Sequence, residues 1–393
     1  MDLEAIAARV EAFVRNEIVP YESDPRYGPH GPSEDLVRHM RGLAAAAGVL
    51  TPHILPDGTH LSQRATALIL RRSGLSPLGP VAVNTAAPDE GNMYLIGKVG
   101  TAEQKKRYLA PLVSGQARSA FFMTEPAMEG GAGSDPSMMQ TVATQEGDGW
   151  VINGRKAFIT GAVGAGVGIV MAKTHESGAN RTTATLFILD LPNTAVRVDR
   201  VLDTIDSAMP GGHAMVTIDN LRLESANILG APHRGFENAQ VRLSPARLSH
   251  CMRWHGAATR AHEIAAAYAC ERQAFGKPLI DHEGVGFMLA DNLIELKLAE
   301  LMIDWCAGVL DSGNQGTLES SMTKASVSEL LYRIADRCVQ VLGGTGVSRD
   351  TIVERVFREM RAFRIYDGPT EVHKWSIAKS IKRRIVNANS ETR

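Results

Sequence analysis

A chain of 393 residues with 44% hydrophobic and 22% charged residues has the composition of a globular protein large enough for two or three domains. The formal net charge of −1 gives no electrostatic reason to expect nucleic acid or an anionic membrane as a partner. No apolar run is long enough to span a bilayer, so we expect no membrane segment.

The cysteines and the N-terminus bear on the compartment. Four cysteines stand at positions 251, 270, 306 and 338, without a Cys-x-x-Cys pair. This spacing favours reduced thiols over a disulfide framework. The first residues are acidic, lack the basic segment of a signal peptide and are too acidic for a transit peptide. We therefore expect a cytoplasmic protein, or one of an organelle matrix in a eukaryote.

Residues 1–118 are predicted to be helical. Apolar residues recur at helical spacing near the start, at Leu3, Ile6, Val10 and Phe13. Four prolines between 20 and 32 interrupt regular structure, and Ser33 can cap the helix that follows. Thr101 and Gln104 have the spacing of a capping box.

Residues 119–232 have the pattern of a small, mostly antiparallel β domain. Its expected strands are short and rich in β-branched, aromatic or aliphatic residues: Ser119–Thr124, Trp150–Asn153, Lys156–Thr160, Ile169–Ala172, Thr185–Leu189 and Met215–Ile218. Asn153-Gly154 lies between two of them and predicts a tight hairpin.

Residues 233–393 are again helical. The stretches 237–274, 281–311 and 317–343 lack strand alternation, and glycine-containing turns separate them. The expected fold class is α+β, with a helical domain at 1–118, a β domain at 119–232 and a helical bundle at 233–393.

The first chemical signal is a strand-like segment that runs into a Gly/Ser loop. Phe122, Met123 and Thr124 precede Glu125-Pro126, and Gly133 with Ser134 follows after an interval. Backbone N–H groups of such a loop can meet a flat ring edge or a phosphate. By itself, the segment fits an ordinary strand and turn about equally well.

Several motifs in order along the chain resemble those of the acyl-CoA dehydrogenase family. They are Thr124-Glu125-Pro126, Arg272-x-x-Phe275-Gly276, Gln340-x-x-Gly343-Gly344 and Tyr366-Asp367-Gly368-Pro369. The resemblance implies a flavoprotein with FAD, whose middle domain is a β-barrel or sandwich and whose C-terminal domain is a four-helix bundle.

The resemblance assigns the flavin contacts of the middle domain. Thr124 would contact the flavin ring and Ser134 its diphosphate, although residues 127–130 lengthen the loop between them. Phe158 stands where the family usually has Trp, and it keeps an apolar face for stacking while losing the indole N–H. Thr160 would bond to the ring. The full set of middle-domain contacts is Phe122, Met123, Thr124, Gly133, Ser134, Phe158, Ile159 and Thr160.

A second group of cofactor contacts would come from a neighbouring subunit. Arg272 resembles the family's arginine that pairs with the partner's FAD diphosphate, and a planar guanidinium suits an anion. The cofactor residues of this group are Arg272, Phe275, Gln340, Val341, Gly343 and Gly344. The resemblance therefore implies a homo-oligomer, with a tetramer built as a dimer of dimers.

Asp367 is the most informative residue. Most of the family has Glu in this slot, where the carboxylate removes the α-proton of an acyl thioester. Ala246 occupies the helix position where some branches carry the base, which leaves Asp367 as the candidate. The flanking cofactor contacts would be Ile365, Tyr366, Pro369 and Glu371, and the substrate contacts Ser134, Arg247, Asp367 and Gly368.

The resemblance implies dehydrogenation of an acyl-CoA to the trans-2-enoyl-CoA, with hydride passing to flavin N5 and electrons passing on to an electron-transferring flavoprotein. The Asp-Gly-Pro subset points to a 4-hydroxyacyl-CoA substrate. Pro369 replaces the usual Thr, and Glu283 fills a slot often held by Gln, which weakens the assignment of individual cofactor contacts.

Two other readings stay open. An oxidase on the same scaffold, of the acyl-CoA or nitroalkane type, would hand its electrons to oxygen. A non-catalytic subunit would only complete a heteromeric dehydrogenase. A metal site is not expected, because the twelve histidines show no His-x-x-x-His or His/Cys cluster.

Overall fold

The computed structural model describes residues 2–55, 57–127, 130–131, 133, 135–175 and 183–391. The chain divides into two compact units, each of which is described by itself. The helical unit comprises Met1–Glu22, Ser62–Gly79 and Ser244–Arg393. The sheet unit comprises Ser23–Leu61 and Pro80–Leu243. The N-terminal third of the sequence therefore contributes to both units.

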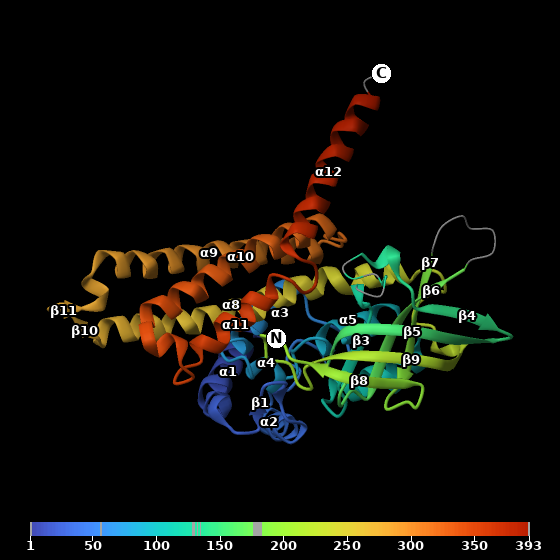
Figure 1. Ribbon diagram of the computed structural model, residues 1–393, viewed down its shortest axis with the longest axis horizontal. Coiled ribbons are helices and arrows are strands. Elements are labelled where there is room, and N and C mark those ends of the chain that lie inside the picture. The colour runs from blue at the N-terminus through green and yellow to red at the C-terminus, as the bar shows by residue number, and fades with distance from the viewer. Residues whose placement is uncertain are drawn as a thin grey trace. The chain divides into compact units, whose positions relative to one another are not determined.

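The sheet unit is built on a seven-stranded sheet (Figure 1). The strand order is β3-β6-β4-β5-β9-β8, with β7 paired to β6. Among the described strands only the β3–β6 and β4–β6 pairings are parallel, so the predicted mostly antiparallel domain is confirmed. The strands are β3 (Ser119–Phe122), β4 (Val142–Glu146), β5 (Gly149–Thr160), β6 (Val167–Thr174), β7 (Thr183–Asp190), β8 (Val196–Leu202) and β9 (His213–Glu224).

The hairpin predicted at Asn153-Gly154 is wrong. β5 runs unbroken through both residues, and the real hairpin joins β4 to β5, with Glu146 opposite Gly149. Gly154 is required for close approach, because a Cβ there would lie 2.3 Å from Thr141 Oγ1. The Asn-Gly pair lies inside a strand, at a point where the register of β5 against β9 shifts between Ile152 and Gly154.

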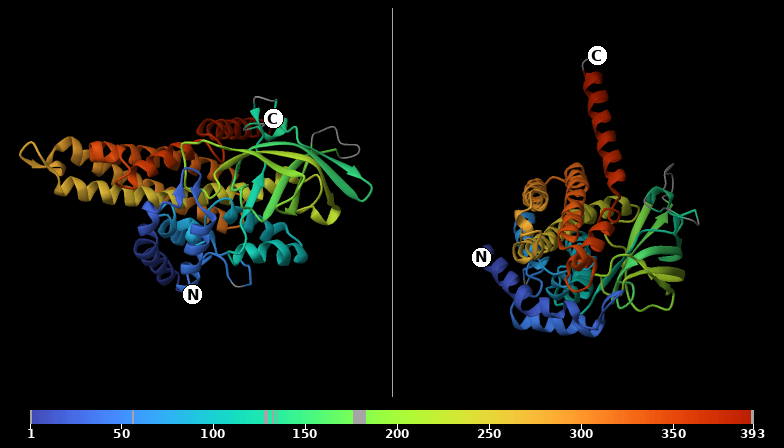
Figure 2. Two further views of the ribbon diagram at one scale, coloured as in Figure 1. Left: turned by 60° about the horizontal axis from the view of Figure 1, so that its bottom comes forward. Right: turned by 60° about the vertical axis from the view of Figure 1, so that its left-hand side comes forward.

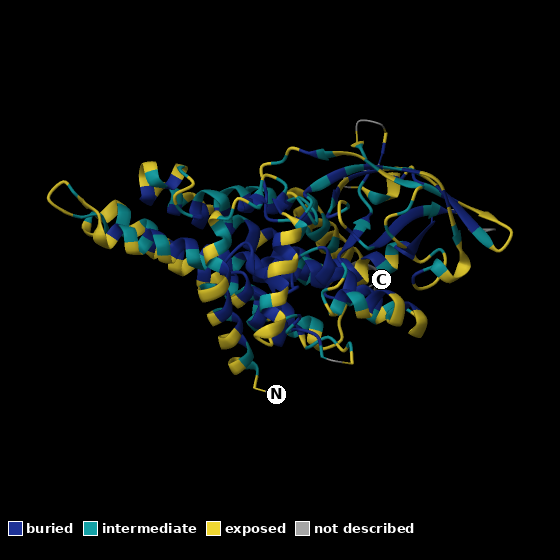
Figure 3. Cartoon of the chain, turned by 90° about the horizontal axis from the view of Figure 1, so that it is seen from below, coloured by how far each residue is buried: buried dark blue, intermediate teal, exposed yellow. Residues whose placement is uncertain are grey.

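Alternate side chains of the strands enter two separate hydrophobic clusters. In β6, Ile169 and Met171 pack with the helices of this unit, whereas Val170 and Ala172 face a cluster that contains Phe187 and Trp150. Buried residues consequently run along the central strands (Figure 3). Because both faces of the sheet are covered, its central strands are a rigid support for the side chains that they carry.

Short helices complete the sheet unit. Ser33 caps α2 by accepting the Leu36 N–H, and Thr101 with Gln104 forms the predicted capping box. The helices, helical turns and small strands are β1 (Tyr27–Gly28), β2 (Gly31–Pro32), α2 (Glu34–Ala46), α4 (Gly79–Ala82, which begins in the helical unit), α5 (Asp89–Val99), α6 (Ala102–Gln104), η3 (Lys105–Leu109), α7 (Ala110–Val113), η5 (Pro136–Met138) and η6 (Ser225–Asn227). The helical turn η2 (Val19–Ser23) belongs to the helical unit except for its last residue.

The helical unit contains the long helices predicted for the C-terminal half. Helices α9 and α10 pack along one another, and α10 also contacts α11 and α12. Within this unit α12 extends away from the other helices (Figure 2). The elements are α1 (Leu3–Phe13), η1 (Val14–Ile18), α3 (Gln63–Ser73), α8 (Gly235–Glu271, which begins in the sheet unit), β10 (Gln273–Ala274), β11 (Lys277–Pro278), η7 (Leu279–Asp281), α9 (Glu283–Asp311), α10 (Thr317–Leu342), η8 (Gly343–Val347), α11 (Val353–Phe363) and α12 (Thr370–Glu391).

Among the described residues, no helix combines the length and apolar character that a membrane crossing requires.

Candidate functional site

The segment that carries Thr124 is fixed to the middle of β5. The Thr124 carbonyl accepts the Ala157 N–H at 2.9 Å, and the Met123 carbonyl accepts from Lys156 Nζ at 3.1 Å. Two sequence motifs more than 30 residues apart, one with Thr124 and one with Phe158, therefore lie together. The half-buried Thr124 hydroxyl belongs to this junction.

A buried ion pair secures the same junction. Lys156 Nζ lies 2.9 Å from Glu125 Oε1, and both side chains are at most 1% exposed. The Glu125 carboxylate also accepts the backbone N–H groups of Gln140 and Thr141. Burial lowers the pKa of Lys156 to about 8, partly offset by the Glu125 charge. Glu125 of the Thr-Glu-Pro motif thus holds the loop in place.

Phe158 projects from an irregular point of β5. Its φ is 55°, it sits where the register against β9 shifts between Lys156 and Ile159, and it is 60% exposed. A bulge of this kind re-aims a side chain out of the sheet. An exposed aromatic face at this position suits stacking on a flat ring.

Two of the predicted cofactor contacts have side chains in the core. Phe122 and Ile159 are each 1% exposed and belong to the cluster on one face of the sheet. Phe122 also lines a cavity of about 600 Å³ together with Ala165 and Val198. Only backbone atoms of Phe122 and Ile159 can therefore meet a ligand on the outer side.

Thr160, at the end of β5, has partners that the sequence motifs did not reveal. Its Oγ1 lies 2.8 Å from His213 Nδ1, and His213 Nε2 lies 2.8 Å from Asp206 Oδ2. Thr160 and His213 are paired across β5 and β9. The glycine-rich loop before them is only partly described: Gly133 has a φ of +50°, and Ser134 lies outside the described residues.

Asp367 lies in the helical unit, in the loop between α11 and α12. Its φ is 52°, in the left-handed region that non-glycine residues rarely adopt, and Gly368 follows with a φ of 102°. The Asp367 carbonyl accepts from Arg247 Nε and from His373 Nε2, both at 3.2 Å. Lys324 Nζ donates to the Gly368 carbonyl at 2.6 Å. These three donors hold the strained loop in one conformation.

The carboxylate of Asp367 is surrounded by basic groups. Oδ2 lies 3.5 Å from His250 Nε2, and the side chain is 21% exposed. Burial lowers the pKa of His373 to about 4, and the charges of Arg247 and Lys324 lower it further. The neutral His373 ring must carry its proton on Nε2, since that atom faces a carbonyl oxygen. No role was assigned from the sequence to His250, Lys324 or His373, because their contacts with the Asp367 loop depend on the packing of α8, α10 and α12 against it.

The neighbours of Asp367 also have defined places. Tyr366 Oη accepts a hydrogen bond from Trp254 Nε1 of α8. Ile365 is 54% exposed, Glu371 is exposed and Pro369 is half-buried. Arg247 was predicted as a substrate contact, which stays a prediction, and its Nε donates to the Asp367 carbonyl.

The remaining predicted contacts lie on the surface of the helical unit. Phe275 is 94% exposed at the β10–β11 turn, and Arg272 beside it is also exposed. This turn lies at the tip of α8 and α9, away from the start of α12 (Figures 1 and 2). Gln340, Gly343 and Gly344 are exposed at the end of α10, whereas the Val341 side chain is buried.

The structure brings together one group that sequence spacing did not indicate. Potential ligand atoms of His53, His60 and Glu90 lie within 4.8 Å of one another in the sheet unit. His60 Nε2 is 3.5 Å from Glu90 Oε1. A tetrahedral zinc site needs ligand atoms about 3.4 Å apart, and a buried His–Glu contact is also ordinary structure. The absence of a metal site therefore stays a prediction.

Models of three domains of one family match the chain. They are the acyl-CoA dehydrogenase N-terminal domain over residues 1–116, the middle domain over 120–220 and the C-terminal domain over 233–382.

Similar proteins agree with this match. "Acyl-CoA dehydrogenase family member 11" of Gallus gallus is 36% identical over 391 residues, 96% of this chain and 50% of that protein. "Probable acyl-CoA dehydrogenase FadE2" of Mycobacterium tuberculosis is 36% identical over 77% of this chain and 75% of its own. The solved structure of a putative acyl-CoA dehydrogenase from Mycobacterium abscessus has a TM-score of 0.87 and 31% identity, and the match covers 98% of each chain. The chain spans about half the length of the family member 11 proteins it matches.

Proposed function

The chain belongs to the acyl-CoA dehydrogenase family, and we propose that it oxidises an acyl-CoA thioester to the trans-2-enoyl-CoA with Asp367 as the base. The observation that carries this proposal is the Asp367 loop. A carboxylate on a strained turn whose backbone carbonyls are held by three side chains is the arrangement expected of a preorganised base.

The α-proton of a thioester is weakly acidic, so a base must be held in contact with it. Asp367 removes this proton, and the pinned loop spares the side chain any rearrangement during the reaction. The positive charges of Arg247 and Lys324 nearby favour the negative charge that develops on the substrate.

The cofactor is FAD, which when bound accepts the hydride from the substrate β-carbon. In the sheet unit the residues that would hold its ring are Thr124, Phe158 and Thr160. Their geometry fits: two hydroxyls and one exposed aromatic face stand on adjacent segments fixed by the Glu125–Lys156 pair. Arg272 and Gln340 are exposed, as contacts to the FAD of another subunit must be.

We further propose a 4-hydroxyacyl-CoA as substrate and an electron-transferring flavoprotein as electron acceptor. Support for the substrate comes from the Asp-Gly-Pro sequence at 367–369, which resembles that of the 4-hydroxyacyl-CoA subset of the family.

Anaerobic titration with a panel of acyl-CoA thioesters tests the function. The expected result is bleaching of the flavin absorbance by one class of acyl-CoA, with the enoyl-CoA as product. Turnover should require the electron-transferring flavoprotein. Steady oxygen consumption with peroxide release would instead indicate an oxidase, and purified protein without flavin would indicate a non-catalytic subunit.

Self-association is proposed from an exposed face of α9. Large apolar side chains that are 42–66% exposed recur at spacings of seven, four, three and four residues: Phe287, Ile294, Leu298, Leu301 and Trp305. This spacing places them along one side of a helix, here called the α9 stripe. A contiguous apolar stripe of this size on a surface helix indicates a protein interface. We propose that a second copy covers it.

Leu298→Asp should dissociate the oligomer, because a carboxylate buried without a partner in an apolar interface is strongly unfavourable. Light scattering should show a fall in mass, and flavin content should fall with it if Arg272 and Gln340 serve the neighbour's FAD. Asn314→Asp, which introduces the same charge at an exposed residue of the turn after α9, is the matched control. An unchanged mass in Leu298→Asp would contradict the proposed interface.

A further inference from the structure

We infer that His213, held by Asp206, sets the direction of the Thr160 hydroxyl hydrogen bond and thereby raises the reduction potential of the flavin beside it. The inference rests on the proposed FAD site. It assigns a positioning role to two residues outside the motifs that identify the family.

The three side chains form a continuous chain within the sheet unit. Thr160 ends β5, His213 begins β9, and Asp206 lies in the connection between β8 and β9. Both hydrogen bonds measure 2.8 Å. The His213 and Asp206 side chains are 13% and 7% exposed, so water competes little for these bonds.

The direction of each bond follows from its acceptor. Burial raises the pKa of Asp206, but the contacts of its carboxylate, led by the hydrogen bond from His213, together lower it by more, so the carboxylate is ionised. An ionised carboxylate only accepts, so His213 carries a proton on Nε2. A neutral ring then accepts at Nδ1, so the Thr160 hydroxyl donates to it; the inference is for this form, because a protonated ring would donate at Nδ1 instead.

A hydroxyl has one hydrogen, and this one is directed to His213. Thr160 Oγ1 therefore offers only lone pairs to a group on its other side. The inference places Thr160 beside N5, the atom that receives the hydride in the proposed reaction; N5 is a hydrogen-bond acceptor in oxidised flavin and an N–H donor in reduced flavin. The His213–Asp206 pair thus makes Thr160 complementary to the reduced form, which favours reduction.

The test is the midpoint potential of the FAD-loaded protein, measured without substrate. In His213→Leu the Thr160 hydroxyl is free to donate to oxidised N5. One hydrogen bond of this kind changes an equilibrium roughly tenfold, which lowers a two-electron potential by about 30 mV. Asp206→Asn, a nearly isosteric change that removes the charge fixing the His213 tautomer, should lower the potential in the same direction. Asp206→Asn therefore provides a second test if His213→Leu does not fold.

A double-mutant comparison separates this role from a general structural one. In a Thr160→Val background, His213→Leu should leave the potential unchanged, because the group through which His213 acts is gone. A potential that rises or stays constant in both single variants would overturn the inference. The inference would also be overturned if His213→Leu lowered the potential equally in the native and the Thr160→Val background. Failure of the proposed function is distinguishable, since the unmutated protein would then purify without flavin or resist reduction by every acyl-CoA.

Discussion

Asp367→Asn is expected to retain bound FAD and to lose its bleaching by acyl-CoA. The amide has nearly the shape of the carboxylate but cannot accept the α-proton. Removal of a positioned general base costs about 10²–10⁴-fold in rate. Stopped-flow measurement of flavin absorbance under anaerobic conditions measures this step directly.

Two variants control this experiment. Asp350→Asn replaces an exposed carboxylate of the same unit, before α11, and should bleach at the normal rate. Asp367→Glu restores the side chain that most of the family carries and should keep measurable activity. Normal bleaching in Asp367→Asn would remove Asp367 from the mechanism, whatever the behaviour of the two controls.

The conformation of the Asp367 loop suits the proposed role of a short carboxylate as base. Asp reaches one methylene less than Glu, so the loop itself must set the position of the carboxylate. Arg247 and His373 bind the carbonyl of Asp367, and Lys324 binds the next carbonyl. Since these contacts go to the backbone, they fix the position of the turn that carries the carboxylate.

Much of the fold could be predicted from local pattern. Ser33 and the Thr101–Gln104 pair cap helices because capping is a contact within four residues. The long helices α8 to α10 follow from composition and glycine punctuation. The Asn153-Gly154 pair gave a wrong hairpin prediction. Gly154 is needed because a Cβ there would collide with Thr141, and no local sequence pattern contains this contact.

The candidate site likewise contains residues that the sequence could identify and residues that it could not. Asp367, Thr124 and Thr160 lie in motifs with a fixed order, so a resemblance could identify them. His250 faces Asp367 across 117 positions of sequence, and His213 faces Thr160 across 53. Such pairs are created by the packing of α8 against a loop and of β5 against β9, and isolated histidines carry no sequence signal for them.

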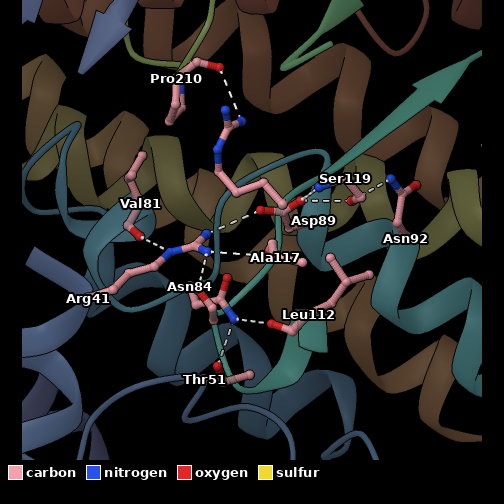
Figure 4. A network of polar contacts seen from close by, with 12 residues as sticks. Arg41, Thr51, Val81, Asn84, Asp89, Asn92, Leu112, Ala117, Ser119 and Pro210 are labelled. Atoms are coloured by element: carbon pink, nitrogen blue, oxygen red, sulfur yellow. Dashed lines mark hydrogen bonds and ion pairs between the residues drawn. The ribbon is translucent and has the colours of Figure 1, made fainter. Parts of the chain in front are cut away.

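Asp89→Ala is expected to destabilise the protein by about 3–5 kcal/mol, the cost of leaving a buried charge without its partner. Asp89 is 4% exposed, at the start of α5. Its Oδ2 lies 3.2 Å from Arg41 Nη2, and its Oδ1 accepts from both the backbone N–H and the hydroxyl of Ser119, at 2.6 and 2.7 Å (Figure 4). Denaturant unfolding followed by circular dichroism measures the loss.

The effect should be large because Asp89 joins three segments of the sheet unit. Arg41 comes from α2, and Ser119 begins β3, the strand that leads to Thr124. Burial lowers the pKa of Arg41, so loss of Asp89 leaves a desolvated guanidinium whose other contacts are to carbonyls (Figure 4). Asp35→Asn is the matched control: Asp35 also lies in a first helical turn and pairs with an arginine, but its side chain is 69% exposed. Exposed pairs contribute about 0–1 kcal/mol, so equal losses in the two variants would contradict a role for burial.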